Sequence, residues 1–291
     1  MTLKTEESLR WWPAPAKLNL FLHVTGRRGD GYHLLQTVFQ LLDYGDRLAF
    51  VLRDDSAVHR ATELAGVPAD QDLVVRAARL LQEAAGVGAG VDIHVDKRLP
   101  MGGGLGGGSS NAATTLVALD RLWNTRLGVD ALAELGMQLG ADVPVFVRGH
   151  SAWAEGVGEQ LQPLELPDRW YLVLIPPVTV STAAIFSDSH LRRDCPPITI
   201  RDFLAAPESP KWGNVCEAPV RARYPEVVAA LDALDALASA RLTGTGACVF
   251  AAFETESAAN AAWQQLAENW QGFVARGVNE SSLNTVLSTE F

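Results

Sequence analysis

The segment from Leu99 to Ala113 reads L-P-M-G-G-G-L-G-G-G-S-S-N-A-A, and six of the seven residues from Gly102 to Gly108 are glycine. Glycine loses more conformational freedom on folding than any other residue. Because of this cost, an ordered run of glycines is expected only where a larger side chain would stop a ligand from reaching the main chain. We expect this segment to bring bare backbone amides close to a bulky anion.

The glycine-rich segment lies between two predicted elements. Val91–Val95 (V-D-I-H-V) alternates apolar and polar residues, which predicts a strand. The residues from 110 to 123 predict a helix, with an apolar stripe made of Leu116, Leu119, Leu122 and Trp123. A helix N-terminus presents unpaired N–H groups and a partial positive charge. A strand, a glycine loop and a helix in this order therefore predict a cradle for phosphate.

Two known nucleotide-binding motifs fit this loop poorly. Gly102 and Gly107 have the glycine spacing of a Walker A loop, but Gly108 stands where that motif requires lysine. The dinucleotide pattern G-x-G-x-x-G matches at Gly102, Gly104 and Gly107, although so glycine-rich a run makes the match almost unavoidable. That pattern also requires an acidic residue about twenty positions on, after a further strand, whereas Asp120 lies on the predicted helix itself.

A flexible linker is a third interpretation, but a linker is not expected between a strand and a helix of one domain. The fourth interpretation fits best. It is a phosphate loop without a lysine, which ends in the two hydroxyl groups of Ser109 and Ser110. Backbone amides would hold the phosphates, and a serine hydroxyl can bind phosphate or a metal-bound water.

The composition narrows the kind of ligand. The 291 residues carry a net charge of −10, which argues against a general nucleic-acid binder or a membrane-surface protein, since both need a basic face. A local basic site for a small anion is still compatible with this charge. The N-terminal segment has acidic residues and no apolar core of a signal peptide, so we expect a cytoplasmic protein. Cys195, Cys216 and Cys248 form no C-x-x-C motif, and we expect them to be reduced thiols.

The hydrophobic pattern starts afresh near residue 161 and predicts two domains, residues 1–160 and 161–291. The segment from Tyr32 to Leu42 fits neither the helical nor the strand template. The other predicted elements are strands at 17–24, 47–52, 170–175 and 272–278, helices at 73–85 (capped by Asp72), 130–139, 182–186, 225–238 and 254–269, and a strand–turn–strand unit over 241–253.

Phosphoryl transfer needs a cation and an oriented acceptor hydroxyl. Lys17 begins an apolar strand, where it is either a functional cation or a strand-end lysine that reaches solvent. Lys97 precedes the glycine loop and either flanks phosphates or is solvated. Asp142 in G-A-D-V-P-V-F is either a base in a pocket or a turn-forming residue.

Two further features leave a structural and a functional interpretation open. The turn L-T-G-T-G-A, at residues 242–247, is either a hairpin turn or a second phosphate-facing loop. Tyr32 and His33 follow a polar turn, and such a pair could hold a ligand ring, although it is more often structural.

Three stretches together carry a resemblance to a known family. P-A-P-A-K-L-N-L-F-L (residues 13–22), P-M-G-G-G-L-G-G-G-S-S-N-A-A (100–113) and R-L-T-G-T-G-A-C-V-F (241–250) resemble, in order and spacing, the three motifs of the GHMP kinase superfamily. D-G-Y-H, D-Y-G-D and L-G-A-D-V-P-V-F, at residues 30–33, 43–46 and 139–146, add to the likeness, which covers nearly the whole chain.

The resemblance implies an α+β fold of two domains, the first like domain 2 of ribosomal protein S5 and the second ferredoxin-like. It implies that ATP binds with its phosphates in the loop, and that Mg²⁺ takes part. The residues implied for this site are Pro100, Met101, Gly102, Gly103, Gly104, Leu105, Gly106, Gly107, Gly108, Ser109 and Ser110, with Lys97 beside them.

Within the superfamily the chain is similar to the branch that works in non-mevalonate isoprenoid synthesis. This implies transfer of the γ-phosphoryl group to the 2-hydroxyl of a methylerythritol that carries cytidine diphosphate. Asp142 matches the family's catalytic aspartate, which accepts the hydroxyl proton. Lys17 matches the catalytic lysine, which keeps that carboxylate ionised. The matching substrate-side residues are Asn19, Tyr32, His33, Thr182 and Phe186, of which Tyr32 and Phe186 would sandwich the cytosine ring.

Two positions depart from the family pattern. Val215 stands where an acid usually precedes the third motif, and Asp72 stands where relatives often carry Asn, which puts an adenine contact in doubt. The competing hypotheses are a homoserine- or mevalonate-type kinase, a dinucleotide-binding oxidoreductase and a non-catalytic nucleotide-binding module. The sequence leaves the oligomeric state and the direct Mg²⁺ ligands open.

Overall fold

The computed structural model describes residues 9–29, 31–209 and 211–288, so Asp30 of the D-G-Y-H stretch lies outside the described residues. The strands are β1 (Trp11–Arg27), β2 (His33–Arg53), β3 (Val58–Arg60), β4 (Gly90–Asp96), β5 (Ala152–Glu155), β6 (Gln160–Pro163), β7 (Trp170–Ile175), β8 (Ala240–Leu242), β9 (Val249–Phe253) and β10 (Gln271–Val278). The helices are α1 (Leu73–Ala85), α2 (Gly107–Leu122), α3 (Val129–Met137), α4 (Val143–Arg148), α5 (Thr182–Phe186), α6 (Ile200–Leu204), α7 (Glu217–Arg223), α8 (Pro225–Asp235), α9 (Glu256–Leu266) and α10 (Ser282–Ser288).

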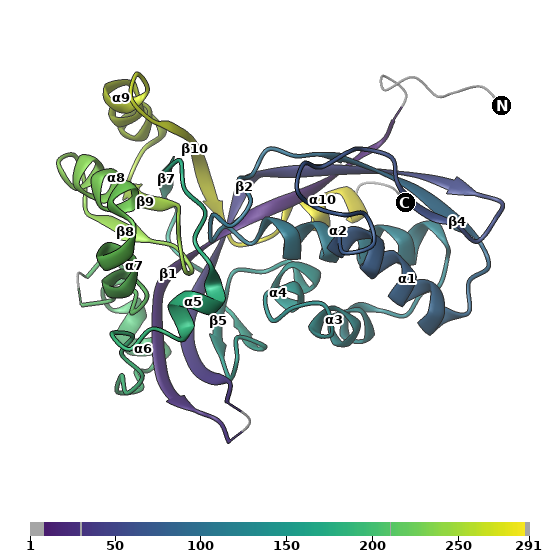
Figure 1. Ribbon diagram of the computed structural model, residues 1–291, viewed down its shortest axis with the longest axis horizontal. Coiled ribbons are helices and arrows are strands. Elements are labelled where there is room, and N and C mark those ends of the chain that lie inside the picture. Colours follow the sequence, from purple (N-terminus) through teal and green to yellow (C-terminus); the bar gives the residue numbers. More distant parts are fainter. Residues whose placement is uncertain (1–8, 30, 210, 289–291) are drawn as a thin grey trace.

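Strand β2 organises the first half of the molecule. It pairs antiparallel with β1, β4 and β5, and β3 joins the far side of β4 in parallel. Figure 1 shows α1, α2, α3 and α4 gathered on one side of these strands. The core between the helices and the sheet contains Phe39, Ile93, Leu116 and Phe146.

The second half has the chain order β7, β8, β9, α9 and β10, and its strands lie in the sheet order β10-β7-β9-β8. This is the 4-1-3-2 order of a ferredoxin-like sheet, as the family resemblance implied. Helices α8 and α9 pack on these strands, and they form the outer wall at the left of Figure 1.

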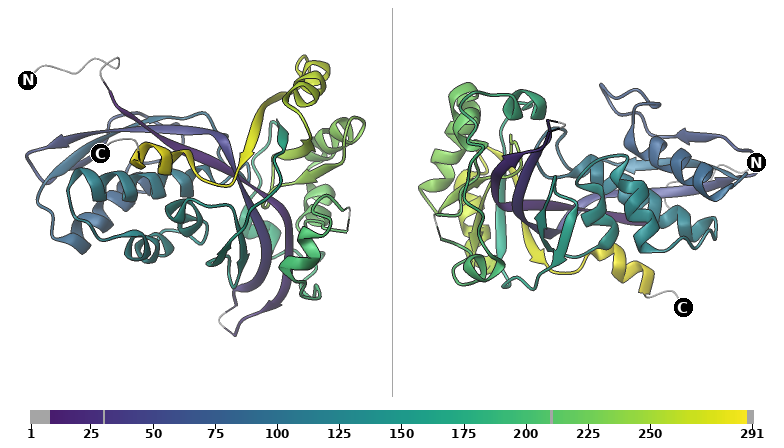
Figure 2. Two further views of the ribbon diagram at one scale, coloured as in Figure 1. Left: turned by 180° about the vertical axis from the view of Figure 1, so that it is seen from behind. Right: turned by 90° about the horizontal axis from the view of Figure 1, so that it is seen from below.

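The two halves share one sheet, which within the described residues has ten strands. Strand β10 pairs with β7 along Gln271–Arg276, and its last residues, Gly277 and Val278, pair with β2. The chain then returns to the first half, where Leu283 of α10 packs on Trp12 of β1 (Figure 2). The division of the chain at residues 160 and 161 stays a prediction.

The predicted elements agree with the structure where local signals are strong. Helix α1 begins at the Asp72 cap, whose carboxylate accepts from the Val74 amide, and it ends at Gly86 in the left-handed conformation. Of the ambiguous segment 32–42, residues 33–42 form the first part of β2. Helix α2 begins at Gly107 rather than at residue 110, so two loop glycines belong to its first turn.

The structure also shows the state of the cysteines and the character of the helices. Cys195, Cys216 and Cys248 are free thiols, and all are buried. Across the described ranges, no helix combines the length and the apolar character that crossing a bilayer requires.

Gly45 of β2 is paired with Pro15 of β1, and the two main chains lie close together there. A Cβ atom there would stand 2.1 Å from the carbonyl oxygen of Ala14 and 2.7 Å from Cα of Pro15. Both are backbone atoms, so the strands would have to separate. We expect Gly45→Ala to lower the free energy of unfolding by about 1–3 kcal/mol, measured by urea denaturation. The control is Gly88→Ala, because nothing lies within 4 Å of its Cβ position. Equal urea midpoints for the two variants would contradict the close contact.

Candidate active site

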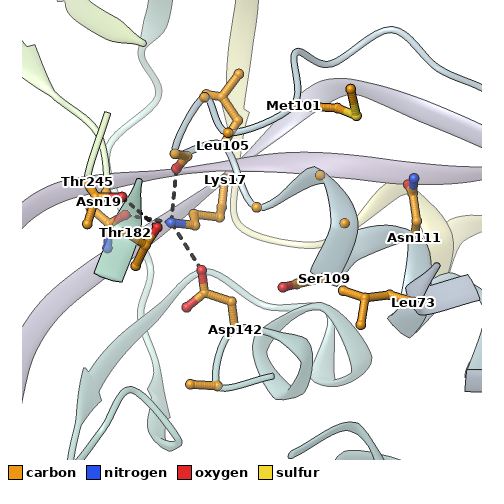
Figure 3. Close-up of a pocket in the computed structure, with 18 of the residues that line it drawn as sticks. Lys17, Asn19, Leu73, Met101, Leu105, Ser109, Asn111, Asp142, Thr182 and Thr245 are labelled. Atoms are coloured by element: carbon orange, nitrogen blue, oxygen red, sulfur yellow. Dashed lines mark hydrogen bonds and ion pairs between the residues drawn. The ribbon is translucent and has the colours of Figure 1, made fainter. Parts of the chain in front are cut away.

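A cavity of about 570 Å³ lies where β1, the start of α2, α4, α5 and the turn between β8 and β9 meet (Figure 3). It brings together most of the residues that the sequence singled out. Its lining includes every residue from Pro100 to Ser109, together with Lys17, Asn19, Lys97, Asp142, Thr182 and Phe186. Residues distant in the chain thus form one site.

The glycine loop is shaped by close packing as well as by the need for bare amides. Gly104 and Gly106 have φ values of +76° and +73°. A Cβ on Gly104 would stand 2.2 Å from the carbonyl oxygen of Thr243, and one on Gly106 would stand 2.8 Å from the Phe146 ring. Only glycine fits at these two positions.

The loop is also bonded to the turn between β8 and β9. The amide of Ala247 donates to the carbonyl oxygen of Gly102, and the amide of Cys248 donates to that of Gly103, each over 3.1 Å. The turn L-T-G-T-G-A is therefore the support on which the loop rests. The sequence left open whether this turn is a hairpin turn or a second phosphate-facing loop. Support of the glycine loop is a further role, which neither interpretation included.

Lys17 is enclosed at the centre of the site, with only 3% of its surface exposed. Its ammonium group donates to Oδ1 of Asn19 over 2.6 Å and to the carbonyl oxygen of Gly104 over 3.1 Å. It also lies 3.3 Å from Oδ2 of Asp142 (Figure 3). A strand-end lysine that reaches solvent would not have this surrounding, so the charge is held inside by oxygen atoms.

Asp142 directs its carboxylate at Lys17 instead of at its own helix. It occupies the N-cap position of α4, but its side chain makes no capping hydrogen bond there. The side chain is 34% exposed and lines the cavity. The carboxylate is thus available to a ligand while its charge is balanced by the ammonium group.

The polar side chains of Asn19 and Thr243 support Lys17 in its ion pair with Asp142. Asn19 uses both ends of its amide, since Oδ1 accepts from Lys17 and Nδ2 donates to Thr37 Oγ1 over 2.9 Å. The Asn19 backbone amide donates to Thr243 Oγ1 over 3.0 Å. Asn19 therefore positions Lys17, in addition to lining the cavity. Thr243 is a member of this network that the sequence did not single out, although it lies in the third motif.

Across the cavity, Thr182 of α5 lies next to Thr245, which belongs to the turn between β8 and β9. Their hydroxyl oxygens lie 2.9 Å apart, and both residues line the cavity (Figure 3). Thr182 lies where the sequence predicted a substrate contact, whereas Thr245 was not predicted individually.

Lys97 lies beside the loop as expected, but its ammonium group is already paired with a carboxylate of the protein. Its ammonium group donates to Oδ2 of Asp46 over 2.6 Å and to the carbonyl oxygen of Leu99 over 2.7 Å. The other oxygen of Asp46 accepts from the amides of Arg98 and Leu99. Asp46 thus anchors the strand-to-loop junction. It belongs to the D-Y-G-D stretch, whose residues were not predicted to have a role in the site.

The two serines of the loop differ in their surroundings. Ser109 lines the cavity, whereas Ser110 is fully buried in α2 and is not among the lining residues. The Ser110 hydroxyl oxygen is enclosed without a hydrogen-bond partner. Ser109 thus faces the cavity, and the binding of a ligand by both hydroxyl groups stays a prediction.

A second hollow of about 1000 Å³ contains the predicted aromatic residues. The rings of His33 and Phe186 stack with centroids 5.3 Å apart, and Tyr32 is 64% exposed at the edge. Thr182 and Phe186 line both hollows, which therefore adjoin. Partial burial lowers the pKa of His33 from its usual value, and the neighbouring guanidinium groups of Arg193 and Arg27 lower it further.

Asp72 lines the cavity near the start of α1, but its carboxylate already has partners. Oδ1 accepts from the Val74 amide over 3.1 Å, and Oδ2 pairs with Arg60 over 2.6 Å. The position that departs from the family pattern is thus occupied by a cap and a buried ion pair.

The Asp46 anchor can be tested by stability. Asp46→Asn would leave the Lys97 ammonium group without its counter-charge and replace one acceptor oxygen by a donor. We expect a loss of about 2–4 kcal/mol in the free energy of unfolding, measured with urea. The control is Asp96→Asn, because Asp96 is 32% exposed and a pair of this kind contributes about 1 kcal/mol or less. Losses of similar size in both variants would count against the anchor.

Comparison with known proteins identifies the family. The model for the GHMP kinases N terminal domain matches residues 72–150, and the model for the GHMP kinases C terminal matches residues 206–272. A 4-diphosphocytidyl-2-C-methyl-D-erythritol kinase from Alkalilimnicola ehrlichii is 60% identical over 274 residues, which cover 94% of this chain and 93% of the relative. The kinase of the same name from Nitrosococcus oceani is 57% identical over 272 residues, covering 94% and 96%.

A solved structure agrees with these relatives. The crystal structure of a 4-(cytidine 5'-diphospho)-2C-methyl-D-erythritol kinase has a TM-score of 0.81 and 35% sequence identity to this chain, and the match covers 92% of this chain and 100% of the other. The chain therefore belongs to the GHMP kinases, in the family of the 4-diphosphocytidyl-2-C-methyl-D-erythritol kinases.

Proposed function

We propose that the protein phosphorylates the 2-hydroxyl of 4-diphosphocytidyl-2-C-methyl-D-erythritol with ATP, giving the 2-phosphate and ADP. The observation that carries the proposal is the Lys17–Asp142 pair, 3.3 Å apart, in a cavity that glycine-loop backbone lines on one side. The aromatic hollow adjoins this cavity through Thr182 and Phe186. A phosphate donor and a base-bearing alcohol would thus meet at the ion pair. In this proposal residues 1–160 bind ATP and carry the catalytic pair, and residues 161–291 supply the substrate side together with Asn19, Tyr32 and His33.

The phosphates of ATP would bind along the loop at the N-terminus of α2. Backbone amides and the helix dipole favour an anion there, and Ser109 adds a hydroxyl group. Mg²⁺ fits the same place, because magnesium in kinases is held by a few protein oxygens together with phosphate oxygens. Ser109 and Asp142 are two of the cavity-lining residues whose oxygen atoms would hold it. Bound there, it would neutralise phosphate charge.

The chemical step follows from the roles of two side chains. Asp142 accepts the proton of the 2-hydroxyl, whose oxygen then forms a bond to the γ-phosphorus. The bond between that phosphorus and the bridging oxygen of ADP breaks, and ADP leaves. The Lys17 ammonium group balances the charge of this carboxylate and stabilises negative charge on the attacking oxygen.

The acceptor would bind with its cytosine ring in the second hollow. Tyr32 and Phe186 are the aromatic faces for the ring, and His33 is placed for its polar edge. Thr182, at the boundary of the two hollows, is placed for the linking part of the molecule. Such a substrate is a small molecule of biosynthesis, which fits a cytoplasmic location and needs neither nucleic acid nor a membrane.

The alcohol that accepts the phosphoryl group distinguishes this function from that of a homoserine or mevalonate kinase. Homoserine kinase from Cytophaga hutchinsonii has the same fold, with a TM-score of 0.62 at 18% identity, which is a likeness of fold alone. With ATP and Mg²⁺, we expect ADP release to depend on the cytidine-bearing alcohol and to stay at background with homoserine or mevalonate. A coupled ADP assay measures this. Turnover of either rival acceptor in its place would refute the proposal.

The catalytic pair gives a second prediction. Lys17→Met and Asp142→Asn keep the size of the side chains and remove one charge each. We expect each variant to lower kcat at least about a hundredfold, because the proton acceptor or its cation is lost, while ATP still binds to the loop. Steady-state kinetics and calorimetric ATP titration measure the two effects. The matched control is Asp130→Asn, an exposed aspartate that pairs with Arg148 on the surface. Unchanged kcat in both site variants would exclude these roles.

A further inference from the structure

One guanidinium group joins the two walls of the aromatic hollow. Arg193 lies in the segment after α5, and its side chain donates four hydrogen bonds. Nη2 donates to the carbonyl oxygens of Phe186 and Asp188, each over 2.8 Å, and Nη1 donates to that of Leu191 over 3.0 Å. Nε donates to the imidazole Nε2 of His33 over 3.1 Å.

The bond between Arg193 and His33 determines where the imidazole proton lies. Arginine stays protonated in proteins and has no acceptor atom, so its Nε–H must be the donor. Nε2 of His33 must then be the acceptor, with its lone pair directed at Arg193. A neutral imidazole that accepts at Nε2 carries its proton on Nδ1.

We propose that Arg193 is a positioning residue, which fixes His33 as a neutral ring with its N–H at Nδ1 so that this N–H can donate to an acceptor atom of the substrate's base. The proposal rests on the proposed function, in which His33 faces the cytosine edge. Cytosine presents two neighbouring acceptors on that edge, the ring nitrogen N3 and the carbonyl oxygen O2. A single N–H of fixed direction suits such an edge.

The electrostatic surroundings agree with a neutral ring. Among the described residues, the guanidinium groups of Arg193 and of Arg27, at the end of β1, act electrostatically on His33. Together with partial burial, both lower the pKa of the imidazole, so the ring is neutral at pH 7. Protonation would place a second N–H against the Arg193 donor.

Arg193 also holds Phe186, the aromatic residue whose ring stacks on that of His33. By holding the carbonyl oxygen of Phe186, it orients the residue whose ring stacks on His33. His33 belongs to β2 and Phe186 to α5, so Arg193 connects two segments that are far apart in the chain. One residue thereby sets both the polar and the apolar contact offered to a base.

The tautomer can be measured without any substrate. We would label the histidines with ¹⁵N and record the imidazole nitrogen shifts at pH 7.5, using His33→Gln to assign the His33 signals. We expect a protonated Nδ1 and an unprotonated Nε2 in the wild-type protein, and loss of this preference in Arg193→Met. A wild-type His33 with its proton on Nε2 would overturn the proposal.

Kinetics then test whether the tautomer serves the substrate. At pH 8 we expect Arg193→Met to raise KM for the cytidine-bearing alcohol about tenfold, the effect of losing one oriented hydrogen bond, with KM for ATP and kcat within about twofold of wild type. Arg193→Met removes one of the causes that lower the pKa of His33, so the ring of the variant is protonated more readily as the pH falls, and a protonated ring again carries an N–H at Nδ1. The defect in KM should therefore shrink with decreasing pH.

A purely structural role of Arg193 predicts a different profile. If Arg193 only held the segment from 186 to 191, KM would be raised equally at every pH, and this result would overturn the proposal. Arg192→Met is the matched control, because Arg192 is exposed, pairs with Asp194, and should not change KM for the alcohol. If the wild-type protein does not phosphorylate the alcohol at all, the proposed function fails, and the ¹⁵N spectrum still decides the state of His33.

Discussion

The buried ammonium group of Lys17 is the interaction on which the site depends. A cation withdrawn from water is stable only where oxygen atoms and an opposite charge replace its hydration. The oxygens come from three separate segments: Asn19 on β1, the carbonyl of Gly104 in the glycine loop, and Asp142 at the start of α4. A shift of any one of these segments would take an oxygen partner away from that charge. The group that would assist catalysis thus also holds the active-site elements together.

Much of the fold could be predicted because its signals are local. Asp72 and Gly86 mark both ends of α1, and the alternation of 91–95 marks β4. The prediction failed where burial removes the pattern. Residues 36–42 of β2 are buried on both faces, so no period of two remains, and Val143–Val147 of α4 are all buried, so no amphipathic stripe marks this short helix. Such segments are defined by tertiary packing.

The site could be predicted as a set of residues but not as a network. The loop, Lys17 and Asp142 were found from residue types and a family resemblance, and they line one cavity. The partner of Lys97 was not found, because Asp46 is distant in sequence and reaches the loop only through the β2–β4 pairing. The start of α2 was predicted three residues too late, because glycine in the first turn hid that boundary.

Strand β10 has a mechanical consequence. Its main chain is bonded to β7 along six residues and to β2 at its last two, so the sheet continues from one half of the molecule to the other. A rigid rotation of one half against the other would break these bonds. The angle between the phosphate-lined cavity and the aromatic hollow is thus built into the sheet.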